Sequence, residues 1–272
     1  MRQELLIAGT EAGYRSHERR QAVGQATRKV ALPIVTAAIF LLLWELLVDA
    51  SRIGAVLLPP PSAILKATWV HRDVLMANAV PTALESIAGF ALSVILGGLL
   101  GVLLVYSRPA ADALYPNVIL FQLVPKVAVA PLFILWFGIG WESRLAIALF
   151  IAFFPIVIST VSGLKAADPN ILRLCNSLTA TRSQVFFRVR LPYSLPFLFN
   201  GMKISMTLAI IGVIVGEFVT SQSGLGYIIL FAGSQMETTI VMAALLMLCI
   251  VGLVLYGLVA VAEKLLMRRF GD

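Results

Sequence analysis

The sequence predicts an all-α integral membrane protein with six membrane-spanning helices. Hydrophobic residues make up 60% of the 272-residue chain, and charged residues make up only 13%, against roughly 25% in soluble domains. The mean hydropathy is +0.94. Several apolar runs are about 18 residues or longer, enough to cross a hydrocarbon core about 30 Å thick. We therefore expect one membrane domain and exclude the class of soluble globular proteins.

The six expected spans are separated by more polar connections. They cover residues 31–48, 87–106, 118–138, 145–163, 201–218 and 240–262. In the second span, four glycines permit close contact with neighbouring helices, namely Gly89, Gly97, Gly98 and Gly101.

Prolines shape two parts of the chain. The triple proline of "LLPPPSAILKATWV" predicts an extended entry, and Ser62 is placed to cap a short amphipathic helix over residues 63–70. In the third span, Pro125 and Pro131 interrupt the helical pattern.

The domain organisation follows from these runs. Residues 1–29 form a basic tail, residues 30–264 form the six-span domain with a central loop at about 165–196, and residues 265–272 form a second tail. Some 30 polar residues precede the first apolar run, and no small-residue cleavage pattern follows it. This is not the pattern of a signal peptide, so we expect the first span to be retained.

The distribution of basic residues predicts the orientation. Most Lys and Arg residues fall in the N-terminal tail, the central loop and the C-terminus. By the positive-inside rule, both termini and the central loop are then cytoplasmic. The net charge of +7 is divided among these segments and forms no single stripe matched to phosphates, so we expect membrane lipid, and no nucleic acid, as a partner. Cys175 and Cys249 offer no disulfide or metal framework.

The central loop contains "LTATRSQVFFRVRLPYSLP", residues 178–196. Asp168 followed by Pro169 is a helix-start pattern and predicts a helix over residues 169–178. Thr181 and Gln184 form a capping-box pattern that restarts a helix, and we expect Pro192 to end it. Two such short helices are stable only when packed on something. From the residues alone, two interpretations remain open: the helices pack on anionic lipid, or they pack on another protein.

The spacing of Thr179, Val189 and Leu191-Pro192 resembles the "EAA…G…I-LP" loop of bacterial ABC-importer permeases. Arg173 stands where that family has Glu, and Thr179 stands where it has Gly. "VPKVAVAPLFILWFGIG", "LLPPPSAIL" and "GEFVTSQSGLGYII" resemble the branch that imports nitrate, sulfonates, taurine and vitamin precursors.

The resemblance implies a type I ABC-importer permease fold that works as a homodimer. It also implies two ATPase subunits and a periplasmic or lipid-anchored substrate-binding protein as partners. The loop residues that would dock on the ATPase are Arg173, Asn176, Ser177, Leu178, Thr179, Ala180, Thr181, Arg182, Phe186, Arg188, Leu191 and Pro192. The chain contains no phosphate-binding Gly-x-x-x-x-Gly-Lys-Ser/Thr motif. We therefore expect no cofactor here, with ATP and Mg bound by the ATPase.

A second set of candidates lies along the translocation path or at its outer gate. It comprises Lys126, Pro131, Glu217, Gly224, Gly226 and Tyr227. An ionisable residue inside a span is a functional hypothesis by default. Lys126 and Glu217 are either buried structural partners or pore-lining groups, whereas Lys203 is interpreted as a snorkelling anchor. The "GLGY" segment is expected to make a tight turn into a short helix. It is either part of the outer gate, touching the binding protein, or an ordinary turn between two spans.

The leading hypothesis is a permease subunit of the bacterial inner membrane. It would move a small solute into the cytoplasm by alternating access: a vitamin precursor such as a hydroxymethylpyrimidine or riboflavin, or nitrate, a sulfonate or taurine. The alternative is a secondary transporter driven by an ion gradient. A membrane enzyme is a third class, for which the sequence has no catalytic grouping.

Overall fold

The structure, a computed structural model, describes residues 31–51, 54, 57–220 and 222–270. The tail expected over residues 1–29 lies outside them. All regular elements in these ranges are helical, as the sequence predicts. The chain divides into two compact units, Met1–Ile64 and Leu65–Asp272.

The first long helix is Ala31–Ser51, and α2 (Pro61–Val70) follows it in the chain. The predicted cap at Ser62 is wrong, because α2 already begins at Pro61. Proline is pre-organised for the first helical position, so the helix starts before the serine. The backbone N–H and the hydroxyl of Ser62 instead donate to the carboxylate of Glu45.

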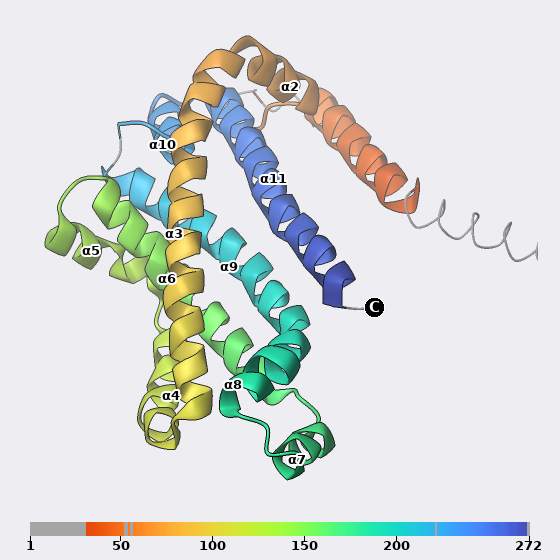
Figure 1. The fold of residues 1–272 in the computed structure, drawn as a ribbon. Helices are drawn as coiled ribbons and strands as arrows, with labels where there is room; N and C mark the ends of the chain where they lie inside the picture. The colour runs from red at the N-terminus through yellow and green to blue at the C-terminus, as the bar shows by residue number, and fades with distance from the viewer. Residues whose placement is uncertain (1–30, 52–53, 55–56, 221, 271–272) are drawn as a thin grey trace, which may run out of the picture. The chain divides into compact units, whose positions relative to one another are not determined.

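The second unit is a bundle of long helices with short elements at its ends (Figure 1). Its long helices are α3 (Arg72–Tyr106), α6 (Trp141–Lys165), α9 (Leu191–Thr220) and α11 (Thr238–Phe270). Its shorter elements are α4 (Arg108–Leu123), η1 (Lys126–Val129), α5 (Ala130–Phe137), α7 (Pro169–Ser177), α8 (Arg182–Val185), η2 (Phe186–Arg190) and α10 (Leu225–Ser234).

The number of apolar helices agrees with the expected spans. Within the described ranges, five helices are long and apolar enough to cross a membrane, and there are up to six when the bent pair of α4 with η1–α5 counts as one span. The helices extend beyond the apolar runs that predicted them: α3 begins at Arg72, before the expected start near residue 87, and α11 continues to Phe270. Hydropathy marks the apolar part of a helix rather than its ends.

The third span is broken at one of the two prolines that the sequence singles out. α4 and the following segment meet at 94°, at Val124 and Pro125. Val124 has φ −62° and ψ 132°, the extended conformation that a following proline favours. Pro131 does not interrupt a helix, and that part of the prediction is wrong. It lies in the first turn of α5, where its missing N–H costs no hydrogen bond.

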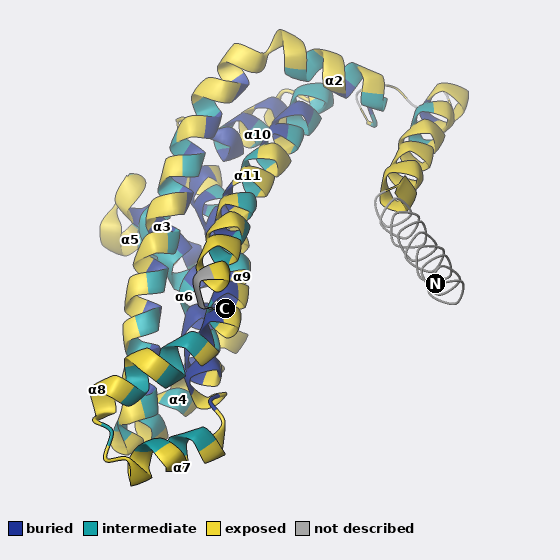
Figure 2. Ribbon diagram, turned by 45° about the vertical axis from the view of Figure 1, so that its right-hand side comes forward, coloured by how far each residue is buried: buried dark blue, intermediate teal, exposed yellow. Residues whose placement is uncertain are grey.

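The centre of the second unit is the close packing of α3, α6 and α9. Buried residues are concentrated along α6 and α9 (Figure 2). Ala148 of α6 lies between two glycines: a Cβ on Gly89 would be 2.6 Å from its Cβ, and a Cβ on Gly212 would be 2.6 Å from its Cα. Small residues at such contacts let helices approach closely in a lipid environment.

The predicted close contacts of the second span are confirmed at three of its four glycines. A Cβ on Gly97 would lie 3.0 Å from Ile156, and one on Gly101 would lie 2.5 Å from Thr160. Gly98 is the exception, because nothing lies within 4 Å of the position its Cβ would take.

We expect Gly89→Ala to destabilise the protein and Gly98→Ala, its matched control in the same helix, to leave it as stable or more so. Overpacking of a tight contact costs about 1–3 kcal/mol, whereas an open helical Gly→Ala change gains about 0.5–1 kcal/mol. Thermal unfolding of the purified protein in detergent measures both. Equal unfolding midpoints for the two variants would contradict the close approach at Ala148.

Candidate functional site

The loop between α6 and α9 contains the short helix α7 and a second helix start at α8, both at the positions that the sequence predicts. The side chain of Asp168 caps α7 by accepting from the N–H of Asn170 at 2.7 Å. Thr181 and Gln184 form the predicted capping box at α8: Gln184 Oε1 accepts from the N–H of Thr181 at 2.8 Å, and Thr181 Oγ1 accepts from the N–H of Gln184 at 3.3 Å. Both predicted helix starts are therefore confirmed.

The joint between these helices is a Schellman-type cap centred on Thr179. The N–H of Thr179 donates to the carbonyl of Asn176 at 3.1 Å, and the N–H of Ala180 donates to the carbonyl of Cys175 at 3.0 Å. Thr179 itself has φ 52°. Glycine is the preferred residue at this position of the motif, and a β-branched residue is strained there. This is the position at which the "EAA…G" pattern has Gly.

Pro192 does not end a helix, and that prediction is wrong. α8, η2 and α9 form one helix, Arg182–Thr220. In η2, a π turn, the N–H of Leu191 donates to the carbonyl of Phe186, five residues earlier. The wider turn accommodates Pro192, whose ring and missing N–H would disrupt a regular α-helical turn.

Most of the predicted loop residues are exposed. We define the loop face as the exposed residues Arg173, Leu174, Leu178, Arg182, Phe187 and Arg188. Asn176, Ser177, Thr179 and Thr181 are also exposed, whereas Ala180, Phe186, Leu191 and Pro192 are half-buried. The loop face thus combines large apolar side chains, with Leu178 70% exposed, and three guanidinium groups.

Arg190 is directed inward and does not belong to the loop face. Its Nη1 donates to the carbonyl of Leu164 at 3.0 Å, and its guanidinium lies 5.8 Å from the ring centroid of Tyr106. The ring of Phe186 also meets Tyr106 edge-on, at 6.0 Å between centroids. The start of the long helix is thereby fixed to the ends of α3 and α6. From the sequence alone, Arg190 is one of several basic residues of the loop, and nothing indicates these inward contacts.

At the opposite end of the bundle, near α10 (Figure 1), Glu217 is buried with 2% of its surface exposed. Its Oε1 accepts from Thr82 Oγ1 of α3 at 2.6 Å, and its Oε2 accepts from the N–H of Gly226 at 2.7 Å. Both carboxylate oxygens are therefore engaged by the protein.

The first turn of α10 is held by the same set of side chains. Thr82 Oγ1 accepts from the N–H of Leu225 at 3.0 Å, and Asn78 Oδ1 accepts from the N–H of Gly224 at 2.8 Å. Gly224 has φ 104°, a conformation that requires glycine. The prediction of a turn into a short helix is confirmed. We call Asn78, Thr82, Glu217 and the three N–H groups of residues 224–226 the Glu217 clasp.

An ion pair that the sequence analysis missed lies beside this clasp. Arg144 of α6 makes a bidentate contact with Glu85 of α3, with 2.7 Å between Nε and Oε2. Arg144 also covers Gly216, where a Cβ would lie 2.8 Å from Arg144 Cγ. The available signal was a pair of opposite charges in or beside two apolar runs.

Lys126 and Pro131 lie in the segment that follows α4, in η1 and α5. Lys126 is half-buried at the break after α4, with Nζ 5.5 Å from the ring centroid of Phe154, and it makes no ion pair with a described carboxylate. Lys203 differs, because its ammonium group pairs with the carboxylate of Glu263 of α11.

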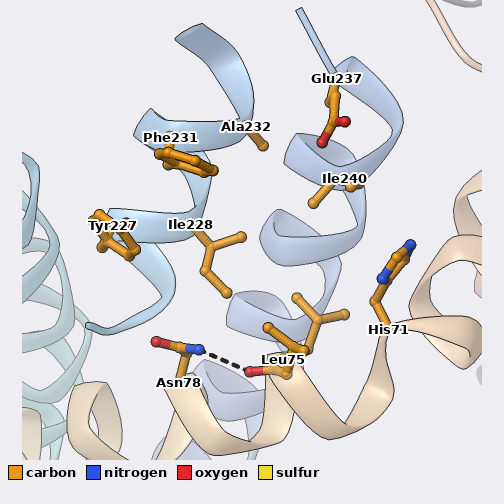
Figure 3. A pocket seen from close by; sticks show the side chains of 10 residues that line it. His71, Leu75, Asn78, Tyr227, Ile228, Phe231, Ala232, Glu237 and Ile240 are labelled. Carbon is orange, nitrogen blue, oxygen red and sulfur yellow. Dashed lines mark hydrogen bonds between the residues drawn. The ribbon is translucent and has the colours of Figure 1, made fainter. Parts of the chain in front are cut away.

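Tyr227 lines a pocket of about 270 Å³ between α3, α10 and α11, which Asn78 of the clasp also lines (Figure 3). Its ring stacks on Phe231 at 5.7 Å between centroids. The pocket is lined by His71, Val74, Leu75, Asn78, Tyr227, Ile228, Phe231, Ala232, Glu237 and Ile240. Most of these side chains are apolar, and the exposed His71 and Glu237 are the imidazole and the carboxylate among them.

The described part of the chain holds no group of three or more His, Cys, Asp or Glu residues arranged to bind a metal ion. Cys175 is half-buried on α7, and Cys249 is exposed on α11.

Comparison with known proteins places this geometry in a family. The profile described as "Binding-protein-dependent transport system inner membrane component" matches residues 89–270. The chain is 32% identical over 237 residues to the formylaminopyrimidine transport permease protein ThiX of Halalkalibacterium halodurans, covering 86% of this chain and 94% of the relative. It is 35% identical over 236 residues to the riboflavin transport system permease protein RibX of Chloroflexus aurantiacus, covering 86% and 88%.

A further relative is the taurine transport system permease protein TauC of Escherichia coli, 28% identical over 247 residues, covering 88% of this chain and 90% of that protein. Among solved structures, an inward-facing conformation of the MetNI methionine ABC transporter is similar with a TM-score of 0.62 and 20% identity. The match covers 74% of this chain and 97% of that one. At this identity the structural likeness supports the fold alone.

We expect Thr179→Gly to stabilise the loop, because the left-handed conformation costs a non-glycine residue about 1–2 kcal/mol. Limited proteolysis of the loop in the purified protein should become slower. The control is Thr181→Ala, which removes the cap of α8 and should cost about 1 kcal/mol. Faster cleavage of the glycine variant would show that Thr179 is not strained.

Proposed function

Because the chain belongs to the family of binding-protein-dependent transport system inner membrane components, we propose that it moves a small solute into the cytoplasm by alternating access driven by a separate ATPase. As a permease subunit of an ABC importer, it is a multi-pass inner-membrane protein and is not itself an enzyme. The solute class we propose is a vitamin precursor such as a hydroxymethylpyrimidine or riboflavin, or nitrate, a sulfonate or taurine. The formylaminopyrimidine, riboflavin and taurine named for the relatives support this range.

The observation that carries the proposal is the loop face at one end of the continuous helix Arg182–Thr220. The loop face exposes the apolar Leu174, Leu178 and Phe187 together with the guanidinium groups of Arg173, Arg182 and Arg188. Such a face suits an apolar groove with an acidic rim, because the guanidinium groups pair with carboxylates there. In our proposal this end is cytoplasmic and docks on the ATPase.

The proposed assembly contains two copies of this chain, two ATPase subunits, and a periplasmic or lipid-anchored binding protein. The MetNI neighbour is itself an ABC transporter, which supports an assembly of this kind. The opposite end of the bundle, with α10 and its pocket, then forms the outer gate that meets the binding protein.

Lys126 is our candidate for the translocation path. It lies at the break of a candidate span, and non-helical backbone at membrane depth is tolerated where it lines a cavity or is buried in protein. Its ammonium group has an aromatic neighbour, Phe154, and no described carboxylate partner.

The docking surface is tested by reversing its charge. We expect the double variant Arg182→Glu, Arg188→Glu to lose co-purification with the ATPase about tenfold or more, because two charge-assisted contacts become repulsive. The control is Arg108→Glu, an exposed residue at the start of α4 outside the loop. Unchanged complex formation would refute the docking role.

Uptake that persists in vesicles without ATP and collapses with an uncoupler would favour the gradient-driven alternative.

The path is tested by thiol labelling. In a background without Cys175 and Cys249, we expect Lys126→Cys to react with a charged, membrane-impermeant thiol reagent in the assembled importer. Leu135→Cys is the control, since this α5 residue is 78% exposed and is expected to face lipid, which excludes a charged reagent. Equal labelling of the two positions, or none at Lys126, would remove Lys126 from the path.

A further inference from the structure

We propose that Glu217 is a positioning residue. It connects α10, the helix of the proposed outer gate, to the C-terminal end of the long helix that begins in the loop between α6 and α9. This proposal rests on the proposed function, because it assigns Glu217 a role within an ATP-driven importer. In this role Glu217 binds neither the solute nor an ion.

The carboxylate is shielded from a solute by burial and by the groups packed against it. Each of its oxygens already accepts a hydrogen bond, one from Thr82 and one from Gly226, and the residue is buried. The surrounding backbone is packed against it: a Cβ on Gly226 would lie 2.8 Å from Oε2, and a Cβ on Gly224 would overlap the carboxylate. A solute would have to break these contacts to reach Glu217.

The carboxylate instead completes the N-terminus of α10. The first N–H groups of a helix lack partners within the helix, and here three consecutive ones are satisfied by side chains of α3 and α9. A negative charge is also favoured at this end of the helix dipole. Without Glu217, the N–H of Gly226 and the hydroxyl of Thr82 each lose a buried acceptor.

α9 carries this attachment to the opposite end of the molecule. Arg182–Thr220 is one helix of 39 residues, about 58 Å long at the α-helical rise per residue. Arg182 of the loop face is the first residue of this helix, and Glu217 lies in its last turn. A displacement of the loop by the ATPase therefore reaches α10 through a single helix and one carboxylate.

The decisive experiment compares Glu217→Gln with Glu217→Asp in the complete importer in proteoliposomes. The Gln side chain is as long as that of Glu, so its amide oxygen can still accept from the N–H of Gly226. The Asp side chain keeps the charge but is one methylene shorter. We expect Gln to support at least about threefold more uptake per ATP hydrolysed than Asp, because the hydrogen bond is the function. The probes are radiolabelled riboflavin, hydroxymethylpyrimidine and taurine. Rescue by Asp and not by Gln would overturn the proposal.

A second pair of variants leaves Glu217 itself unchanged. Gly226→Ala places a methyl group against the carboxylate, whereas a Cβ on Gly233, farther along α10, would have its nearest neighbour 3.9 Å away. We expect Gly226→Ala to lower uptake per ATP about tenfold or more, as expected for disruption of a charge-assisted hydrogen bond, and Gly233→Ala to behave as wild type. Equal uptake by the two would refute the role of the clasp.

A distance measurement tests the linkage without a solute. Spin labels at Val219 of α9 and Leu230 of α10, both exposed, are placed in one of the two copies. They should give one narrow distance distribution in the assembled wild type, with and without vanadate-trapped MgATP. In Glu217→Ala the distribution should broaden. A wild-type distance that changes on trapping, or an unchanged distribution in the variant, would overturn the inference. Failure of the proposed function is a separate result, namely no ATP-dependent uptake of any probe by the wild type.

Discussion

The close approach of three helices at Ala148 is the constraint on which the rest of the second unit depends. Lipid offers no hydrophobic driving force between helices, so α3, α6 and α9 associate through packing, and Gly89 and Gly212 let them reach the alanine. The polar groups of the bundle are then placed by these same helices. Thr82 comes from α3, and Glu217 comes from α9. A carboxylate can be buried there because the packing brings its donors within bonding distance.

Local patterns predicted the parts of the fold that local physics decides. Asp168 before Pro169 caps a helix because the interaction spans only a few residues, and Pro125 breaks one because its ring acts on its immediate neighbour. Pro192 was mispredicted because the preceding π turn relieves the conflict within a longer helix. The partners of Glu217 could not be predicted, since Thr82 lies 135 residues away and no pattern specifies that pairing.

The same limit applies to ionisable residues in the spans. Sequence reasoning treats each of them as a functional candidate because an isolated charge in lipid is costly. The structure separates them by their partners: Lys203 pairs with Glu263, Arg144 pairs with Glu85, and Glu217 caps a helix. Lys126 lies near an aromatic ring and has no described carboxylate partner. It could therefore contact a solute without breaking an ion pair.

The loop between α6 and α9 is built with a stability deficit that docking can offset. α7 has nine residues, and an isolated helix of this length is unstable in water. The joint adds strain, because Thr179 adopts φ 52° at a cost of about 1–2 kcal/mol. An equal amount of docking energy is needed to hold the loop in shape, and each 1.4 kcal/mol is about a tenfold change in affinity. In the proposed assembly, docking on the ATPase would stabilise this strained joint, which directly precedes the helix that reaches Glu217.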